Sequence, residues 1–270
     1  KAKTRQESQP AAKASRPERL DKSDEILAFE NVGLCYKGSR EEALTGISFR
    51  VKRNQVVGII GGTGSGKSSL INLIPRFYDA TAGKILVDGR PITEYPLLSL
   101  RSRIGVVPQK AVLFAGSIRD NMRWGNEDAT DEEIWEALAC AQAKDVVAAK
   151  DGQLDYKLSA GGKNLSGGQR QRLTIARALV KKPDILILDD SFSALDYATD
   201  RALRDALREL RDMTVVIVSQ RTASIQSADQ IIVLEDGEVA GIGSHSRLLK
   251  ECEVYREIYD SQLGKGEHAS

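Results

Sequence analysis

The stretch QVVGIIGGTGSGKSSLINLI, residues 55–74, decides the fold of this chain. Its opening, QVVGII, is short and rich in branched aliphatic residues, which predicts a buried strand. Its close, SSLINLI, is apolar and predicts a helix. Between them GGTGSGKS, residues 61–68, matches the pattern G-x-x-x-x-G-K-[ST]. Because the strand, the full pattern and the helix occur together, the sequence predicts a loop that binds phosphate rather than a flexible Gly/Ser turn.

This phosphate-binding loop (P-loop) indicates which residues would hold a nucleotide and its metal ion. Glycines let backbone N–H groups converge on phosphate oxygens without clashes from Cβ atoms, and the start of the following helix adds positive potential. We expect Lys67 to neutralise the β- and γ-phosphate oxygens, a catalytic role, and Ser68 to offer its hydroxyl to Mg²⁺. The predicted nucleotide contacts of the loop are Gly61, Gly62, Thr63, Gly64, Ser65, Gly66, Lys67, Ser68 and Ser69.

Two adjacent carboxylates follow a second aliphatic run, ILIL, at residues 185–188. Asp189, at the end of this predicted strand, is the expected metal-side carboxylate, which would act through a water bound to Mg²⁺. The alternative is that Asp189 caps the next helix. Asp190 would then lie beside the γ-phosphate, where a general base or a group that orients water belongs.

The stretch LSGGQRQRLTIARALVKKP, residues 165–183, predicts a helix that begins with glycines. Ser166 is the expected N-cap, and Pro183 ends the helix. On the simpler interpretation, this is only a well-made helix. Gly167 and Gly168 in its first turn cost stability relative to alanine, however, which suggests that an anion approaches bare backbone N–H groups there. The chain therefore carries two predicted phosphate cradles.

Strand and helix patterns indicate how these motifs are arranged. DILILD and MTVVIV, at 184–189 and 213–218, are continuous apolar runs typical of strands covered on both faces. DRALRDALREL, residues 200–210, is amphipathic and long enough for the crossover between them, with its charged face expected in solvent. TDEEIWEALACAQA, residues 130–143, opens with a predicted capping box. Short β-type segments at 26–36, 43–51 and 84–89 complete the α/β pattern, with Asn54 expected to adopt a left-handed turn conformation.

Composition excludes several classes of protein. Lys and Arg total 39 against 38 Asp and Glu, so no overall field favours nucleic acid or an anionic membrane as a partner. The three cysteines are far apart, which argues against a disulfide framework or a zinc site. No apolar run approaches the roughly 18 residues of a membrane span. Residues 1–25 are polar and predict a flexible linker, and a start at Lys1 rather than Met predicts further chain upstream.

Together these motifs resemble the ATP-binding cassette (ABC) family, specifically the nucleotide-binding domain of exporter-type ABC transporters. The resemblance rests on LSGGQ, on VVPQ, which ends at Gln109, and on SALD at 193–196. RFYDATAGKILVDG and LFAGSIRDNM resemble exporters rather than importers. The likeness covers nearly all of residues 26–263. It implies an α/β fold with a P-loop NTPase (RecA-like) core, an antiparallel β subdomain and an inserted α-helical subdomain at about residues 112–164, followed by a C-terminal tail at 264–270.

The resemblance also implies roles for further residues. Tyr36 would stack on adenine, Gln109 would contact Mg²⁺ and link it to a membrane domain, and the SALD loop with Asp196 would cross a dimer interface. In such head-to-tail dimers each of two ATP molecules lies between the P-loop of one subunit and the LSGGQ of the other. The residues implied for this second contact are Ser166, Gly167, Gly168 and Gln169.

The cofactors implied are ATP and Mg²⁺. The partners implied are a second ABC half-transporter and a transmembrane domain upstream in the same chain, with no nucleic acid. The location implied is the cytoplasmic face of the cell membrane.

Two positions depart from the family pattern. The family usually has Glu where this chain has Asp190, and a histidine where this chain has Gln220 in IVSQRTAS. The histidines of the chain are His245 and His268, outside any such motif. Both departures resemble the degenerate subunit of a heterodimeric exporter, which binds ATP but hydrolyses it slowly. The predicted catalytic set is therefore Asp190, Gln220 and Lys67, in a site of low intrinsic activity.

Three alternatives remain open at this level. The chain could be part of a fully active homodimeric exporter, since Asp can act as a slow base. It could be a regulatory ATP-binding subunit that never hydrolyses ATP. It could also be a soluble ABC ATPase of DNA repair or translation, although a long coiled-coil insertion or a tandem cassette, the usual marks of that class, are missing from the sequence.

Overall fold

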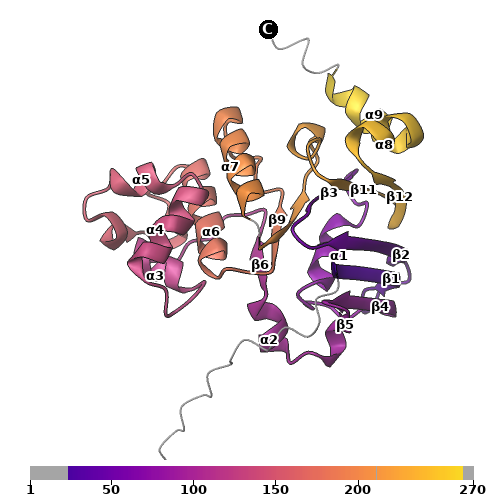
Figure 1. The fold of residues 1–270 in the computed structure, drawn as a ribbon, viewed down its shortest axis with the longest axis horizontal. Coiled ribbons are helices and arrows are strands. Elements are labelled where there is room, and N and C mark those ends of the chain that lie inside the picture. Colours follow the sequence, from indigo (N-terminus) through magenta and orange to yellow (C-terminus); the bar gives the residue numbers. More distant parts are fainter. Residues whose placement is uncertain (1–23, 211, 264–270) are drawn as a thin grey trace, which may run out of the picture.

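The structure is a computed structural model, and it describes residues 24–210 and 212–263. It is a mixed α/β fold in which an antiparallel β subdomain and a helical region flank a central, mostly parallel sheet (Figure 1). The predicted α/β class is confirmed. In the described part of the chain, no helix has the length and apolar character that a membrane span requires. The predicted tail at 264–270 and all but the last two residues of the predicted linker at 1–25 lie outside the described residues.

The central sheet has six strands in the order β12-β11-β3-β10-β9-β6. Its β6, β9, β10, β3 and β11 are parallel, and β12 pairs with β11 in the antiparallel sense. All residues of β10 and the first four of β9 are buried, because the sheet is covered on both faces. The strands are β3 (Val56–Gly61), β6 (Ile104–Val107), β9 (Ile185–Asp189), β10 (Thr214–Val218), β11 (Gln230–Glu235) and β12 (Glu238–Gly243).

Parallel pairing gathers the carboxyl ends of four strands at one edge of the sheet. β3 leads into the P-loop, and β9 ends at Asp189, which is in register with Val218 at the end of β10. β6 ends at Val107, two residues before Gln109. In open α/β sheets this edge is where ligands bind, so the topology brings the predicted site residues together.

The antiparallel subdomain is a second sheet in the order β2-β1-β4-β5. The rings of Phe29 and Phe49 stack in its core, with their centroids 4.5 Å apart. Helix α1, which follows the P-loop, buries Leu70, Ile71 and Leu73 in the same apolar cluster. The P-loop helix is therefore fixed by contacts with both sheets. The elements are β1 (Glu25–Cys35), β2 (Glu42–Lys52), β4 (Ala82–Val87), β5 (Arg90–Pro91) and α1 (Lys67–Leu73).

The helical region lies on the opposite side of the central strands from the antiparallel sheet (Figure 1). Its predicted capping box at Thr130 and Glu133 is present, which confirms that helix start. Ile134, Leu138 and Ala141 are buried, as expected from their spacing. Its elements are β7 (Gly116–Ser117), α3 (Ile118–Arg123), α4 (Asp131–Cys140), α5 (Lys144–Ala148), η2 (Gln153–Asp155), β8 (Lys157–Leu158), η3 (Ala160–Gly162) and α6 (Gly167–Val180).

The remaining helices lie outside the helical region. On α7 the Arg201–Asp205 pair is exposed, but the side chains of Arg204 and Asp200 are only 13% and 14% exposed. The expectation that all charges of this helix lie in solvent was therefore wrong for the second pair, since Arg204 also bonds the Ala223 carbonyl. These helices are η1 (Ile92–Glu94), α2 (Leu97–Ser102), α7 (Tyr197–Glu209), η4 (Thr222–Ser224), α8 (His245–Glu251) and α9 (Glu253–Leu263).

A largely buried cluster of charges joins the antiparallel subdomain to the central sheet. The Arg103 guanidinium, just before β6, donates to Asp88 at 2.9 Å and to Asp184 at 2.5 Å. Asp88 lies in the turn between β4 and β5 and also pairs with Arg53. Asn54, next to Arg53, has the predicted left-handed conformation, with φ of 62°.

Candidate nucleotide-binding site

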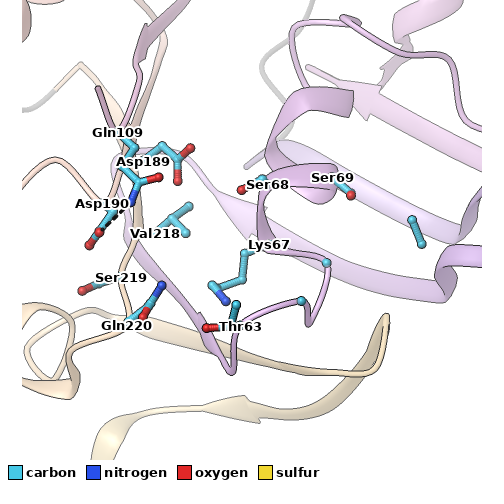
Figure 2. Close-up of a pocket in the computed structure, with 13 residues that line it drawn as sticks. Thr63, Lys67, Ser68, Ser69, Gln109, Asp189, Asp190, Val218, Ser219 and Gln220 are labelled. Carbon is cyan, nitrogen blue, oxygen red and sulfur yellow. Dashed lines mark hydrogen bonds between the residues drawn. The ribbon is translucent and has the colours of Figure 1, made fainter. Parts of the chain in front are cut away.

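A cavity of about 280 Å³ lies where the four carboxyl strand ends meet the P-loop (Figure 2). All the residues that the sequence assigns to the γ-phosphate and the metal line this cavity. Outside the lining lie the LSGGQ residues and the predicted contacts Tyr36, Gly61, Gly62, Ser65 and Asp196. Val218, Ser219 and Ala43 were not predicted. Val218 and Ser219 could have been found, because they lie at and just after the end of the predicted strand at 213–218. No sequence signal points to Ala43. The lining residues are Ala43, Thr63, Gly64, Gly66, Lys67, Ser68, Ser69, Gln109, Asp189, Asp190, Val218, Ser219 and Gln220.

The ammonium group of Lys67 is held by the P-loop itself. It donates to the Gly61 carbonyl at 2.9 Å, to the Gly62 carbonyl at 2.5 Å and to the Ser65 hydroxyl at 3.2 Å. Burial lowers the pKa of Lys67, while the nearby charges of Asp189 and Asp190 act in the opposite direction. A phosphate oxygen that enters the loop would replace one of these acceptors, and its charge would favour the protonated lysine.

The glycines of the loop fall into two kinds. A Cβ at Gly61 would lie 2.1 Å from the Leu234 carbonyl oxygen, and Gly64 and Gly66 have φ of 86° and 94°, so the fold itself requires these three glycines. A Cβ at Gly62 would meet nothing within 4 Å, and its φ lies outside the left-handed region. Packing within the chain therefore does not explain Gly62, whereas close approach of a ligand to its backbone would.

The paired carboxylates lie opposite Lys67. Burial raises the pKa of Asp189, the charge of Asp190 raises it further, and Lys67 lowers it. Asp190 has a positive φ of 44°, and its backbone N–H donates to the Val218 carbonyl at 2.9 Å. The side-chain amide of Gln109 donates to the Asp190 carboxylate at 3.3 Å. The backbone turn after β9 thus places Asp190 beside Gln109 in the cavity.

The reading of Asp189 as a helix cap is wrong. The N-cap of the next helix, α7, is Asp196, whose carboxylate accepts from the Thr199 N–H at 2.9 Å and from the Thr199 hydroxyl at 2.8 Å. Asp189 is instead the last residue of β9 and lines the cavity.

The donor set fits Mg²⁺. Ser68, Asp189 and Gln109 offer a hydroxyl, a carboxylate and an amide oxygen, which are the hard oxygen ligands that this ion prefers. Among the described residues no cluster of three or more His, Cys, Asp or Glu side chains could hold a metal by itself. In Mg²⁺ sites a few protein oxygens are typically supplemented by phosphate and water.

Gln220 lies on the side of the cavity that faces Lys67 and Thr63 (Figure 2). It is exposed and follows Ser219, whose N–H donates to the Ile59 carbonyl of β3 at 3.1 Å. An amide at this position can donate one of its hydrogens to a phosphate oxygen, but it cannot become a cation or transfer a proton.

Tyr36 lies next to the cavity rather than in its lining. Its hydroxyl donates to the Ser69 hydroxyl at 2.9 Å, and Tyr78 meets its ring edge-on at 5.1 Å. Tyr36 as a residue is half-buried.

The second predicted cradle lies away from the first. Ser166 caps α6 as predicted, and Gln169, predicted only as a nucleotide contact, completes a capping box. Both Ser166 and Gly167 are exposed. A Cβ at Gly167 would meet nothing within 4 Å, whereas one at Gly168 would lie 3.2 Å from the Ala194 carbonyl oxygen. Gly167, like Gly62, is a glycine that packing within the chain does not explain. The structure does not bring LSGGQ to the P-loop of the same chain.

Comparison with known proteins agrees with this geometry. Residues 44–193 match the family model described as ABC transporter. The chain is 44% identical over 239 residues to an uncharacterized ABC transporter ATP-binding protein, YfiB, of Bacillus subtilis, covering 88% of this chain and 42% of that protein. It is 39% identical over 245 residues to YgaD of the same organism, a putative multidrug export ATP-binding/permease protein, covering 89% of this chain and 42% of that protein.

A solved structure of a bacterial Atm1-family ABC exporter with ATP bound superimposes on the chain with a TM-score of 0.85 at 37% identity. It covers 90% of this chain and 43% of that one. The chain thus spans about two fifths of the length of the relatives that it matches. Since the family model covers more than half of its 270 residues, the chain belongs to the ABC transporter family, as an ATP-binding domain whose relatives include ABC exporters.

Proposed function

We propose that this chain is the ATP-driven motor domain of a heterodimeric exporter, and that ATP bound at its own P-loop is hydrolysed slowly. The observation that carries the proposal is that Asp190 and Gln220 line the same cavity as Lys67. Asp190, Gln220 and Lys67 are the groups expected to act on the γ-phosphate. Asp190 is therefore a short carboxylate at this position, and Gln220 is an amide that cannot ionise.

Reach, rather than basicity, makes Asp190 a poor base. Ordinary pKa values of Asp and Glu differ by about 0.4, or roughly half a kcal/mol, which would scarcely change a base. Loss of one methylene draws the carboxylate back by about 1 Å, and a displacement of that size can cost about 100-fold in a positioned reaction. The carboxylate is also engaged by Gln109.

The exposed LSGGQ supports a role at a partner's site. Ser166 and Gly167 are exposed, and no side chain covers the backbone at Gly167. A ligand bound at the P-loop of another chain could therefore approach it. In a head-to-tail dimer they would complete the site of a second ABC half-transporter, whose own P-loop supplies the competent catalytic groups. ATP binding would then drive dimerisation, and turnover would occur mainly at the partner's P-loop.

An exposed aromatic surface supports a transmembrane partner. Phe114 and Trp124 are 45% and 70% exposed, and their rings lie 4.9 Å apart. They line a cavity of about 270 Å³, which also includes Arg177 and Lys181, in the helical region that follows the Gln109 loop. We propose that a transmembrane domain in the same protein docks there, at the cytoplasmic face of the membrane. The name of the relative YgaD, a putative multidrug export ATP-binding/permease protein, joins an ATP-binding part with a permease.

ATP turnover of the purified chain, at concentrations where it dimerises, tests the proposal. We expect slow hydrolysis that rises by about 10- to 100-fold in the variant Asp190→Glu with Gln220→His, because reach and a protonatable group are restored. Asp190→Asn with Gln220→His is the matched control, since it lacks a carboxylate at 190 and should gain nothing. Fast turnover of the unaltered chain, or no gain in the first variant, would contradict the proposal.

Turnover and nucleotide analysis together separate two of the alternatives. A fully active homodimer would show fast turnover without any substitution. A purely regulatory subunit would bind ATP and retain it uncleaved, even in a complex whose partner site turns over. Nucleotide analysis of the trapped complex after turnover distinguishes ATP from ADP at this P-loop.

A further inference from the structure

The C-terminal helix α9 reaches the loop that carries Gln220. The side-chain amide of Gln262, in the last turn of α9, donates to the Gln220 carbonyl at 2.7 Å. Its oxygen accepts from the Thr222 backbone N–H at 2.9 Å and from the Thr222 hydroxyl at 3.0 Å. One side chain therefore makes three hydrogen bonds to the loop, from a position 42 residues further along the chain.

Most other hydrogen bonds of this loop are local. Ser219 is fixed to β3, and the Ser219 hydroxyl accepts from the Arg221 N–H at 2.9 Å. The Thr222 carbonyl accepts from Ile225 and Gln226 in the turn that follows. In the described part of the chain, the hydrogen bonds that reach residues 220–222 from outside 219–226 all come from Gln262. The path of the backbone at Gln220 thus depends on this contact.

The other end of α9 is firmly anchored. Tyr255 is fully buried, and its hydroxyl lies 2.8 Å from Nδ1 of His245 in α8. Helix α9 therefore has a fixed base in the fold, and its last turn contacts the edge of the cavity through the half-buried Gln262. A helix anchored at one end and bonded to a loop at the other can hold that loop in place.

We propose that Gln262 is a positioning residue for ATP hydrolysis: it holds the Gln220 backbone so that the Gln220 amide is directed at the γ-phosphate position. This inference rests on the proposed function, which assigns Gln220 to that phosphate. Gln220 has a donor but no charge, so its contribution depends on its distance and direction from the phosphate. Helix α9 thereby influences turnover at this site without touching nucleotide.

The variant Gln262→Met keeps the length of the side chain and removes all three hydrogen bonds. We expect single-turnover hydrolysis at this site to fall by about 10-fold with little change in nucleotide affinity, since displacements of a fraction of an ångström already slow a positioned reaction. Glu257→Ala, an exposed substitution on the same helix, is the control and should leave the rate unchanged. Amide hydrogen exchange at Thr222 should become faster in Gln262→Met, and thermal unfolding reports whether the variant is folded.

The decisive comparison is made in a Gln220→Ala background. If Gln262 acts through the Gln220 side chain, Gln262→Met has no further effect on the rate there. An equal fall in both backgrounds would indicate a structural role only and overturn the inference, as would an unchanged rate in Gln262→Met alone. Should Gln220→Ala itself leave the rate unchanged, the assignment of Gln220 in the proposed function fails, and the inference fails with it.

Discussion

Gln109 donates its side-chain amide to the Asp190 carboxylate across 3.3 Å, joining two loops whose residues are 81 positions apart. The expected metal ligand and the expected base are therefore hydrogen-bonded to each other. Asp190 would be oriented by the same residue whose amide oxygen can face Mg²⁺, so the position of the metal and the position of the base are linked through one side chain.

Gln109→Ala should weaken binding of ATP with Mg²⁺ by about 10-fold, because it removes an oxygen ligand and the support of Asp190. Binding of ATP without Mg²⁺ should change little. Titration of nucleotide with and without the metal measures both affinities. Gln220→Ala is the matched control, since Gln220 lines the same cavity and is assigned to the γ-phosphate but not to the metal, so any loss of affinity should be the same with and without Mg²⁺. An equal loss with and without Mg²⁺ would argue against a metal role for Gln109.

Tyr36→Ala should weaken ATP binding by about 5- to 150-fold, because stacking of a base on an aromatic ring contributes about 1 to 3 kcal/mol. Tyr36→Phe keeps the ring and removes only the hydrogen bond to Ser69, so its loss should be smaller. Fluorescent-nucleotide titration compares the two variants. Equal affinities for Tyr36→Ala and the unaltered chain would refute the adenine assignment.

Gly167→Ala should stabilise the chain while impairing the dimer. Alanine is favoured over glycine in a helix by up to about 1 kcal/mol, and the added Cβ meets nothing in this chain. The same methyl group would obstruct approach of a partner's phosphate to the helix start, so turnover in a complex with the partner should fall. Gly168→Ala is the comparison, since its Cβ would crowd the Ala194 carbonyl and give no gain in stability. Thermal unfolding and ATPase assays separate the two effects.

Much of the fold could be predicted because its signals are local. The buried strand segments at 185–188 and 215–218 are continuous aliphatic runs, and the helix starts at Thr130 and Ser166 carry their caps in sequence. The cavity could be anticipated for a related reason. Parallel strands place their carboxyl ends at one edge, so residues that follow four strands converge without any long-range information.

Contacts between distant segments could not be predicted. Gln262 lies on an ordinary amphipathic helix, and nothing in the sequence marks it as a partner of Gln220 and Thr222. Arg204 fits an i,i+4 surface pair with Asp200, but the packing of α7 against the loop at Ala223 buries it. In both cases the deciding contact is set by how whole elements pack, which local patterns do not encode.

Cys140 should react slowly with iodoacetamide in the folded chain. Burial raises the pKa of its thiol from 9.0 to about 11, with a smaller effect from the charge of Glu209. At pH 8 the reactive thiolate fraction is therefore about 100-fold smaller than in the unfolded chain. The rate should rise steeply as the pH approaches 11. Peptide mass spectrometry of labelling in buffer and in urea measures the two reaction rates of Cys140. Similar rates in buffer and in urea would contradict burial of the Cys140 thiol at the end of α4.

Arg103→Met should strongly destabilise the fold. Arg103 is 10% exposed, as is its partner Asp88, and its second partner Asp184 is 12% exposed. The substitution takes one of two cations from the buried Asp88, which Arg53 still contacts, and removes a bonded cation from Asp184. Breaking a buried ion pair typically costs about 3 to 5 kcal/mol.

Arg50→Met is the matched control for this substitution. Arg50 also contacts two carboxylates, Glu25 and Glu30, but its side chain is 57% exposed. A surface pair of this kind contributes little to stability, because water solvates the separated charges. Urea unfolding of both variants should therefore give a much larger loss for Arg103→Met. Equal losses would mean that the Arg103 cluster does not hold the antiparallel subdomain against the central sheet.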